Sequence, residues 1–220
     1  MSRRRIGVLG GTFDPVHVGH LALARSACVA FSLDEMRLMP TGAPWQKRGV
    51  VASPQQRLAM LQLAIAGDPR LRADSREVER SGPTYTVDTL AGLRGELGPE
   101  VALILILGSD QLRNLATWHR WRELLQHAHL ACTQREQVSL ADLPEPVEQL
   151  VSSHGAQALP DAPSGSIVFF SMPPVPVSAT ALRLALSRGE RPVELVPPGV
   201  LDYIEAANLY GARIGGSAHD

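Results

Sequence analysis

The stretch VALILILG, residues 101–108, constrains the fold of this chain more than any other feature. All residues in 101–107 are apolar, yet the run is much shorter than the ~18 residues that a helix needs to cross a bilayer. A continuous apolar run of this length is typical of a central parallel strand whose two faces are both covered. It therefore predicts a parallel sheet with this segment as a central strand and helices packed on both faces.

The rest of the chain alternates between strand and helix patterns, as a parallel α/β sheet requires. Further strands are expected at residues 5–10, 36–39, 129–133 and 166–171. Helices are expected at 54–66, with Ser53 as the N-cap, at 86–97, around Leu124 and Leu182, and where Leu21, Ala24, Cys28 and Phe31 recur at helical spacing. This alternation predicts an α/β fold: an open, mainly parallel, Rossmann-like sheet with right-handed crossovers and helices on both faces, in a single domain over residues 1–210.

Two segments are expected to leave this pattern. Residues 136–165 are polar and rich in Pro, Ser and Glu, which predicts an irregular excursion from the sheet with one short helix around residues 147–151. Residues 211–220 are expected to form a frayed, disordered tail.

The composition excludes several classes of protein. A chain with 45% hydrophobic and 20% charged residues is typical of a soluble globular protein rather than a disordered one. The net charge of -1 provides no basic excess for a nucleic-acid surface, and no apolar run is long enough to span a membrane. The basic start is followed by too short an apolar run for a secretory signal, so a cytoplasmic location is expected. Cys28 and Cys132 lack the spacing of a metal site and are expected to be buried thiols.

The opening segment GVLGGTFDPVHVGH, residues 7–20, combines a strand, a glycine turn and the start of a helix. Backbone amides at Gly10 and Gly11 can approach a phosphate closely, although the spacing is neither a dinucleotide fingerprint nor a P-loop. If the helix begins near Val18, His17 and His20 lie at i, i+3 in its first turn, where the helix dipole favours anions. Gly19 leaves room between them for a flat group.

Two other interpretations of the histidine pair remain open. One histidine caps the turn while the other packs against the fold, or the pair binds a metal ion. The metal site has less support because the local spacing provides no carboxylate, cysteine or further histidine as another ligand.

A second candidate for phosphate binding is VSATALR, residues 177–183. Ser178 and Thr180 are suitable capping residues for the helix that follows, and Arg183 lies one turn into it. An ordinary capped helix with a solvated arginine explains the same pattern. Two such sites, from distant parts of the chain, suit a triphosphate held from both sides.

Together these segments resemble the nucleotidyltransferase superfamily that carries an H-x-G-H motif near the N-terminus and an I-S-[ST]-T-x-x-R motif near the C-terminus. Within it, the chain is similar to the bacterial nicotinate-nucleotide adenylyltransferases through PTYTVDTL from Pro83, GSDQLRNLATW from Gly108, and residues 40–47. The resemblance covers residues 6 to about 210. Phosphopantetheine adenylyltransferases share the first motif but lack the Tyr-Thr and Trp segments.

The resemblance implies transfer of AMP from ATP to nicotinate mononucleotide, giving deamido-NAD and pyrophosphate in NAD biosynthesis. Mg²⁺ would be bound mainly through the ATP phosphates, with no metal ligand from the protein. The implied catalytic residues are His17, His20 and Arg183. The implied ATP-binding residues are Gly10, Gly11, Thr12, Phe13, Gly19, Gly108, Asp110, Ser178 and Thr180, and those for nicotinate mononucleotide are Lys47, Tyr85, Thr86, Trp118 and Arg135.

Several of these roles have ordinary structural alternatives. Trp118 stacks on the pyridine ring or anchors the surface, and Asp110 binds ribose hydroxyls or caps a turn. Lys47 is the only lysine among 21 basic residues, which favours a site that needs a point charge on a flexible stem. Near it, Trp45 and Gln46 replace the Pro-His of the family pattern, and after Arg135 the residues 136–137 replace its Pro-Gly.

Two further functions remain open at this stage. The same phosphate-binding arrangement serves other H-x-G-H nucleotidyltransferases that use a different phosphate acceptor. It would also serve a regulatory protein that binds ATP without turnover. The sequence leaves the oligomeric state open between monomer and homodimer.

Overall fold

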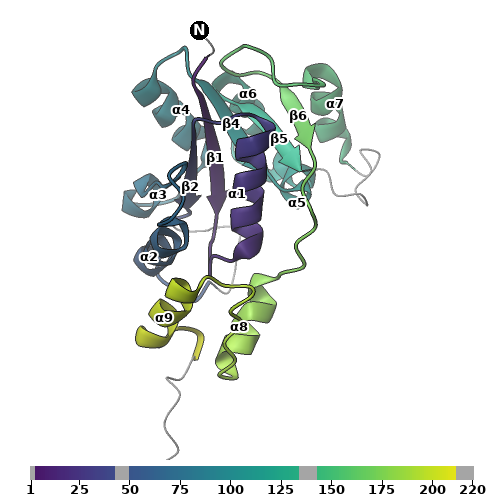
Figure 1. Ribbon diagram of the computed structural model, residues 1–220. Helices are drawn as coiled ribbons and strands as arrows, with labels where there is room; N and C mark the ends of the chain where they lie inside the picture. Colours follow the sequence, from purple (N-terminus) through teal and green to yellow (C-terminus); the bar gives the residue numbers. More distant parts are fainter. Residues whose placement is uncertain (1–2, 43–49, 134–142, 212–220) are drawn as a thin grey trace, which may run out of the picture.

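The computed structural model describes residues 3–42, 50–133 and 143–211. These residues form a six-stranded sheet in the order β3-β2-β1-β4-β5-β6, in which all neighbouring strands are parallel (Figure 1). The strands are β1 (Arg5–Gly11), β2 (Glu35–Pro40), β3 (Leu71–Ala73), β4 (Ala102–Leu107), β5 (His129–Thr133) and β6 (Ile167–Phe170). The predicted open parallel sheet in a single domain is confirmed.

Strand β4 is the central strand that its apolar run predicted. It pairs with β1 on one side and β5 on the other, and every residue from Ala102 to Leu107 is buried. Because side chains alternate across a sheet, Ile104 and Ile106 belong to one core cluster and Leu103 and Leu105 belong to the other. The strand therefore contributes to the cores on both faces of the sheet.

Helices cover both faces, as expected. The first core cluster receives side chains from α1 (Val18–Ala30), α2 (Pro54–Ile65), α8 (Ala179–Ser187) and α9 (Pro198–Ala206). The second receives them from α4 (Thr86–Leu97), α5 (Ser109–Arg113), α6 (Leu124–His127) and α7 (Glu145–His154). The remaining helical segments are α3 (Arg76–Glu79) and the 3-10 turns Leu115–Thr117, Trp121–Glu123 and Leu209–Gly211.

Local sequence signals agree with most of these elements. Ser53 caps α2, because its hydroxyl accepts the Gln56 N–H while the Gln56 side chain accepts the Ser53 N–H. Strand β3 and helices α3 and α9 were not expected, and α7 is longer than the short helix predicted inside residues 136–165. Residues 136–142 of that excursion and 212–220 of the predicted tail lie outside the described residues.

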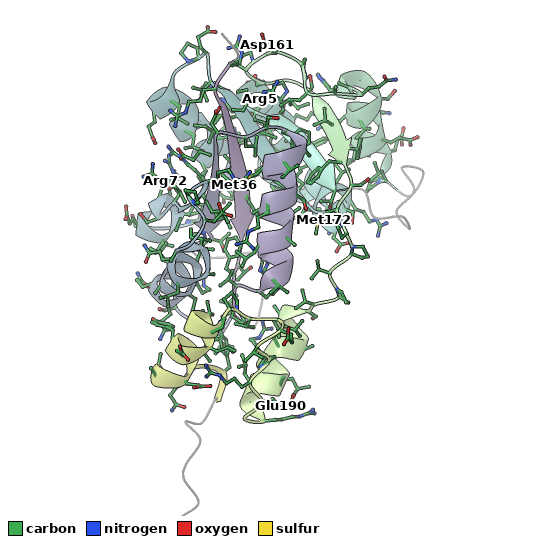
Figure 2. All side chains as sticks on the ribbon, viewed as in Figure 1. Arg5, Met36, Arg72, Asp161, Met172 and Glu190 are labelled. Carbon is green, nitrogen blue, oxygen red and sulfur yellow. The ribbon has the colours of Figure 1, made fainter. Side chains whose placement is uncertain are left out.

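The two ends of the sheet are occupied differently. The N-terminus enters at the amino ends of the strands, whereas α8 and α9 lie at the opposite end, beside the tip of β1 (Figure 1). Figure 2 accordingly places Arg5 and Asp161 at one end of the molecule and Glu190, just after α8, at the other. The loop that follows β1 contacts α8 through Asp14 and Arg183, at the carboxyl end of the sheet, where ligands of open α/β sheets commonly bind.

Cys28 and Cys132 are both buried and free, as predicted. Burial raises the pKa of both thiols, that of Cys132 to about 12, so neither is suited to nucleophilic chemistry. None of the helices in the described part of the chain combines the length and apolar character that a membrane crossing requires.

Candidate active site

A cavity of about 130 Å³ opens at the carboxyl ends of β1, β2 and β4. None of His17, His20, Ser178, Thr180 and Arg183 is among its lining residues. Its lining residues are Val8, Gly10, Gly11, Thr12, Met39, Thr41, Glu77, Thr84, Tyr85, Thr86, Thr89, Leu105, Ile106, Leu107, Gln111, Trp118 and His119. The turn after β1 and the Tyr-Thr and Trp segments, distant in sequence, therefore line the same cavity.

The turn after β1 leaves its backbone accessible from the cavity. A Cβ atom built at Gly10 meets nothing within 4 Å, so this position is open space that a ligand can occupy. A Cβ at Gly11 would lie 2.9 Å from the Phe13 ring, which is itself buried beneath the turn. Phe13 has a positive φ of 51°, which is uncommon for a residue other than glycine and marks a tightly constrained backbone.

The histidine pair lies at the start of α1, as the spacing predicted. His17 is the N-cap, and the His17 and His20 rings stack with their centroids 3.7 Å apart. The backbone N–H of His17 donates to Nδ1 of His20 at 3.3 Å, so the ring proton of neutral His20 resides on Nε2. No acidic residue occupies the first turn of α1, which leaves the positive end of the helix dipole available to an anion.

The C-terminal motif adjoins the same turn. Ser178 is the N-cap of α8, and Thr180 and Arg183 follow within its first turns. The Arg183 Nη1 donates to the backbone carbonyl of Asp14 at 2.8 Å, three residues before His17. The two motifs are therefore brought together, as their pairing in the sequence predicted.

Gly19 explains how the two helix starts can come so close. A Cβ atom at Gly19 would lie 2.7 Å from Cγ1 of Val177, just ahead of α8. The N–H of Val18 also donates to the carbonyl of Leu195 at 2.9 Å, in the segment that leads into α9. Close packing of the two segments therefore favours glycine at this position, whether or not a ligand also occupies the space.

The Tyr-Thr segment forms the start of α4 on the opposite side of the cavity. Tyr85 is the N-cap of α4 and Thr86 is its first residue, so backbone amides at this helix start face an accessible region. The rings of Tyr85 and His119 lie 4.2 Å apart, centroid to centroid. Trp118 is half-buried and lines the same wall, which places a flat apolar surface beside the start of α4.

The segment after β4 matches its prediction less closely. Gly108 is the N-cap of α5, and its N–H donates to Oε1 of Gln111 at 2.9 Å. Asp110 is exposed and does not line the cavity, whereas Gln111 does. Lys47 and Arg135 lie outside the described residues, as do Trp45 and Gln46.

Sequence reasoning missed two buried charged residues beside this site. Arg57, in α2, is fully buried and donates to the carbonyls of Thr12, Thr41, Gly42 and Ala52. Burial lowers the pKa of its guanidinium, although the charge of Asp14 partly compensates. The sequence contains an indication of this burial, because Arg57 falls on the apolar face of α2 at helical spacing from Met60 and Leu61.

The second missed residue is Glu77, which is 7% exposed and lines the cavity. Its Oε1 accepts the hydroxyl of Thr89 at 2.7 Å. Burial raises the pKa of Glu77 despite this hydrogen bond. Its position in the four-residue α3 gave no periodic signal that would predict burial.

The described residues contain no group of three or more His, Cys, Asp or Glu side chains that could hold a metal ion. This arrangement favours anion binding by amides, imidazoles and a guanidinium over a protein-held metal centre.

Comparisons with known proteins agree with this geometry. The family described as Cytidylyltransferase-like matches residues 8–185. The chain is 43% identical over 212 residues to the probable nicotinate-nucleotide adenylyltransferase of Pseudomonas aeruginosa, covering 95% of this chain and 98% of the relative. It is 44% identical over 214 residues to the protein of the same name from Pseudomonas putida, covering 95% and 96%.

A solved structure is similar in fold. It is the Plasmodium falciparum nicotinic acid mononucleotide adenylyltransferase complexed with NaAD, with a TM-score of 0.72. The alignment covers 96% of this chain and 99% of that one, at 18% sequence identity. At that identity the similarity bears on the fold alone, and it agrees with the Rossmann-like sheet described above.

Proposed function

The chain belongs to the cytidylyltransferase-like family and, within it, to the nicotinate-nucleotide adenylyltransferases, and from this premise we propose how its site works. It transfers the adenylyl group of ATP to nicotinate mononucleotide, releasing pyrophosphate and deamido-NAD in NAD biosynthesis. The observation that carries this function is the single cavity lined by Gly10, Gly11 and Thr12 on one side and by Tyr85, Thr86 and Trp118 on the other. One side suits a nucleotide phosphate, and the other suits a flat ring with an acidic group.

The reaction requires positioning rather than covalent chemistry by the protein. A phosphate oxygen of the mononucleotide attacks the α-phosphorus of ATP in line, that P–O bond forms, and the bond to the β-phosphate breaks as pyrophosphate leaves. We assign the developing charge to His17, His20 and Arg183, with hydroxyls of Ser178 and Thr180 beside them. Their contribution is electrostatic, and it depends on donors being oriented before the reaction begins.

The second substrate is assigned to the start of α4. Amides at Tyr85 and Thr86 would bind the nicotinate carboxylate, where the helix dipole favours a negative group. Trp118 offers a face for stacking on the pyridine ring. Gly108 and Asp110 are assigned to the nucleoside part of ATP, and Lys47 and Arg135 to the phosphate of the mononucleotide, on the resemblance alone.

Mg²⁺ belongs to the proposal as a partner of the triphosphate. It would neutralise phosphate charge while bound to phosphate oxygens and water, which agrees with its reluctance to lose its water ligands. The described residues contribute no three-ligand cluster of their own, so the protein would bind the metal through ATP.

The function is tested by pyrophosphate release from ATP with a panel of acceptors. We expect rapid release with nicotinate mononucleotide, slower release with nicotinamide mononucleotide, and none with phosphopantetheine. Fast turnover only with another acceptor would reassign the protein within the superfamily. Tight ATP binding without release for any acceptor would identify a regulatory protein instead.

His20→Ala tests the proposed catalytic role of the histidine pair. The change removes a charge stabiliser whose orientation is fixed by the His17 backbone, so we expect kcat to fall by at least ~10². His20 is only half-buried, so the variant should remain folded by circular dichroism. His154→Ala, an exposed histidine on α7, is the matched control and should retain wild-type kcat. Near wild-type turnover in a folded His20→Ala protein would exclude this role.

A further inference from the structure

The last described segment of the chain folds back onto the phosphate site. Tyr210 lies in the 3-10 turn Leu209–Gly211 and is 8% exposed. Its hydroxyl donates to Oδ1 of Asp14 at 2.7 Å, which joins residues 196 positions apart in the chain. Tyr210 also has a positive φ of 59°, a conformation that costs free energy for a bulky residue and persists where other contacts impose it.

Asp14 connects this tyrosine to Arg183. The Asp14 carboxylate also accepts the N–H groups of Val51 at 2.9 Å and Ala52 at 3.1 Å, which fixes it in place. Its backbone carbonyl accepts Nη1 of Arg183, and Oδ2 lies 3.9 Å from the same nitrogen. Asp14 is therefore held by Tyr210 on one side and holds Arg183 on the other.

Arg183 has few other restraints. Besides Asp14, its guanidinium makes one long contact, 3.4 Å from Nη2 to the Thr180 hydroxyl, among the residues that the structure describes. A flexible arginine stabilises a phosphate only after it has been ordered, so a fixed anchor lowers the cost of binding. The position of Asp14 therefore determines where the remaining guanidinium donors point.

We propose that Tyr210 is a positioning residue for the phosphate site, because its hydroxyl fixes Asp14 and Asp14 orients Arg183. This inference rests on the proposed function, in which Arg183 binds the ATP phosphates and the pyrophosphate product. A phenylalanine would fill the same buried volume, so the hydroxyl is needed for its hydrogen bond rather than for packing. Burial and the Asp14 carboxylate raise the pKa of Tyr210, which keeps the hydroxyl protonated as a donor.

The test is calorimetric titration of magnesium pyrophosphate into the wild-type protein and its variants. Tyr210→Phe should weaken pyrophosphate affinity by about fivefold, the usual net effect of losing one ordinary hydrogen bond, because the lost bond acts on the phosphate only through Arg183. Tyr203→Phe, a partly buried tyrosine on α9, is the matched control and should bind like wild type. In an Arg183→Gln background, Tyr210→Phe should cause no further loss, because the group that it positions is gone.

Two results would overturn the inference: wild-type affinity in Tyr210→Phe, or an equal loss in the presence and absence of Arg183. Asp14→Asn provides a second variant that keeps the backbone carbonyl and the side-chain shape, and it should repeat the same dependence on Arg183. Pyrophosphate binding needs no acceptor, so the experiment is independent of which mononucleotide the enzyme uses. A wild-type protein that binds pyrophosphate but does not adenylylate nicotinate mononucleotide would contradict the proposed function and leave this inference standing.

Discussion

Glu77 is an acidic residue buried in the wall of the cavity. It lines the cavity beside Thr84 and Tyr85 and accepts a hydrogen bond from Thr89. Burial disfavours its charged form and raises its pKa above the ordinary value. Between the ordinary and the raised pKa, the folded protein binds more protons at this position than the unfolded chain does. Stability therefore falls as the pH rises through that window.

Glu77→Gln is expected to remove this pH-dependent cost, because the amide keeps the shape and the acceptor oxygen but carries no charge. The difference in melting temperature between variant and wild type should shift in favour of the variant from about pH 4 to about pH 7. Differential scanning calorimetry across this range measures it. Glu194→Gln, at an exposed position, is the control for the chemical change itself. A constant difference for Glu77→Gln would show that its burial carries no titration cost.

At the scale of elements, two arginines hold backbone carbonyls at opposite ends of the sheet. Arg57 of α2 joins the turn after β1 to the segment after β2, through the carbonyls of Thr12, Thr41 and Gly42. Arg94 of α4 does the same at the amino ends of β4 and β5, through carbonyls that include those of Val101, His127 and Pro163. The two residues perform similar structural work, but only Arg57 holds the backbone of the turn after β1.

Arg57→Lys and Arg94→Lys therefore form a matched pair. An ammonium group cannot reach several carbonyls as a planar guanidinium does, so each change should lower the free energy of unfolding by about 2–4 kcal/mol. Only Arg57→Lys should also raise KM for ATP, because Thr12 lines the cavity. Urea unfolding and steady-state kinetics measure the two effects. Equal KM changes in both variants would mean that ATP binding depends on overall stability rather than on the turn.

The length of a helix or strand determines whether the sequence predicts it. The longer elements were predicted because burial affects many of their residues at once. Burial on both faces makes β4 a continuous apolar run, and burial on one face gives α2 its helical period. Strand β3 has only three residues, and α3 has four, so neither is long enough to show a period. The helix predicted around residues 147–151 is α7, which is longer than expected because its start is set by Pro144 and Glu145 rather than by an apolar run.

The residues of the candidate site also differ in how far the sequence predicts them. The paired motifs around His17 and Arg183 were found because their residue types are unusual at that spacing, and their chemistry suggests anions. The Tyr-Thr and Trp segments were placed only through the family resemblance. Glu77 and Tyr210 act through contacts that no local pattern encodes, since each depends on segments that only the fold brings together. Helical spacing indicates that Arg57 is buried, but it does not indicate which carbonyls the guanidinium contacts.

At the scale of the whole molecule, the two motifs to which we assign phosphate binding meet, although they lie near opposite ends of the chain. The start of α1 contacts the segments before α8 and α9, through Gly19 against Val177 and Val18 against Leu195. A triphosphate held by both motifs would therefore link the beginning of the fold to its end. Ligand binding should then stabilise the folded protein as one unit.

An ATP analogue with an uncleavable α,β-bridge tests this linkage. At about 100 times its Kd, the analogue should stabilise the wild-type protein by about 2.7 kcal/mol, which corresponds to a rise in Tm of ~5–10 °C for a chain of this size.

Hydrogen exchange read by mass spectrometry should show protection at two places together, residues 17–20 and residues 178–183. Nicotinate mononucleotide alone should instead protect residues 85–86, because that mononucleotide is assigned to the other wall of the cavity. In Arg183→Gln the analogue should lose its protection of the start of α8 first, because the remaining contacts come from α1 and the turn after β1. Protection of residues 17–20 with none at 178–183 in the wild-type protein would show that the C-terminal motif does not bind the triphosphate.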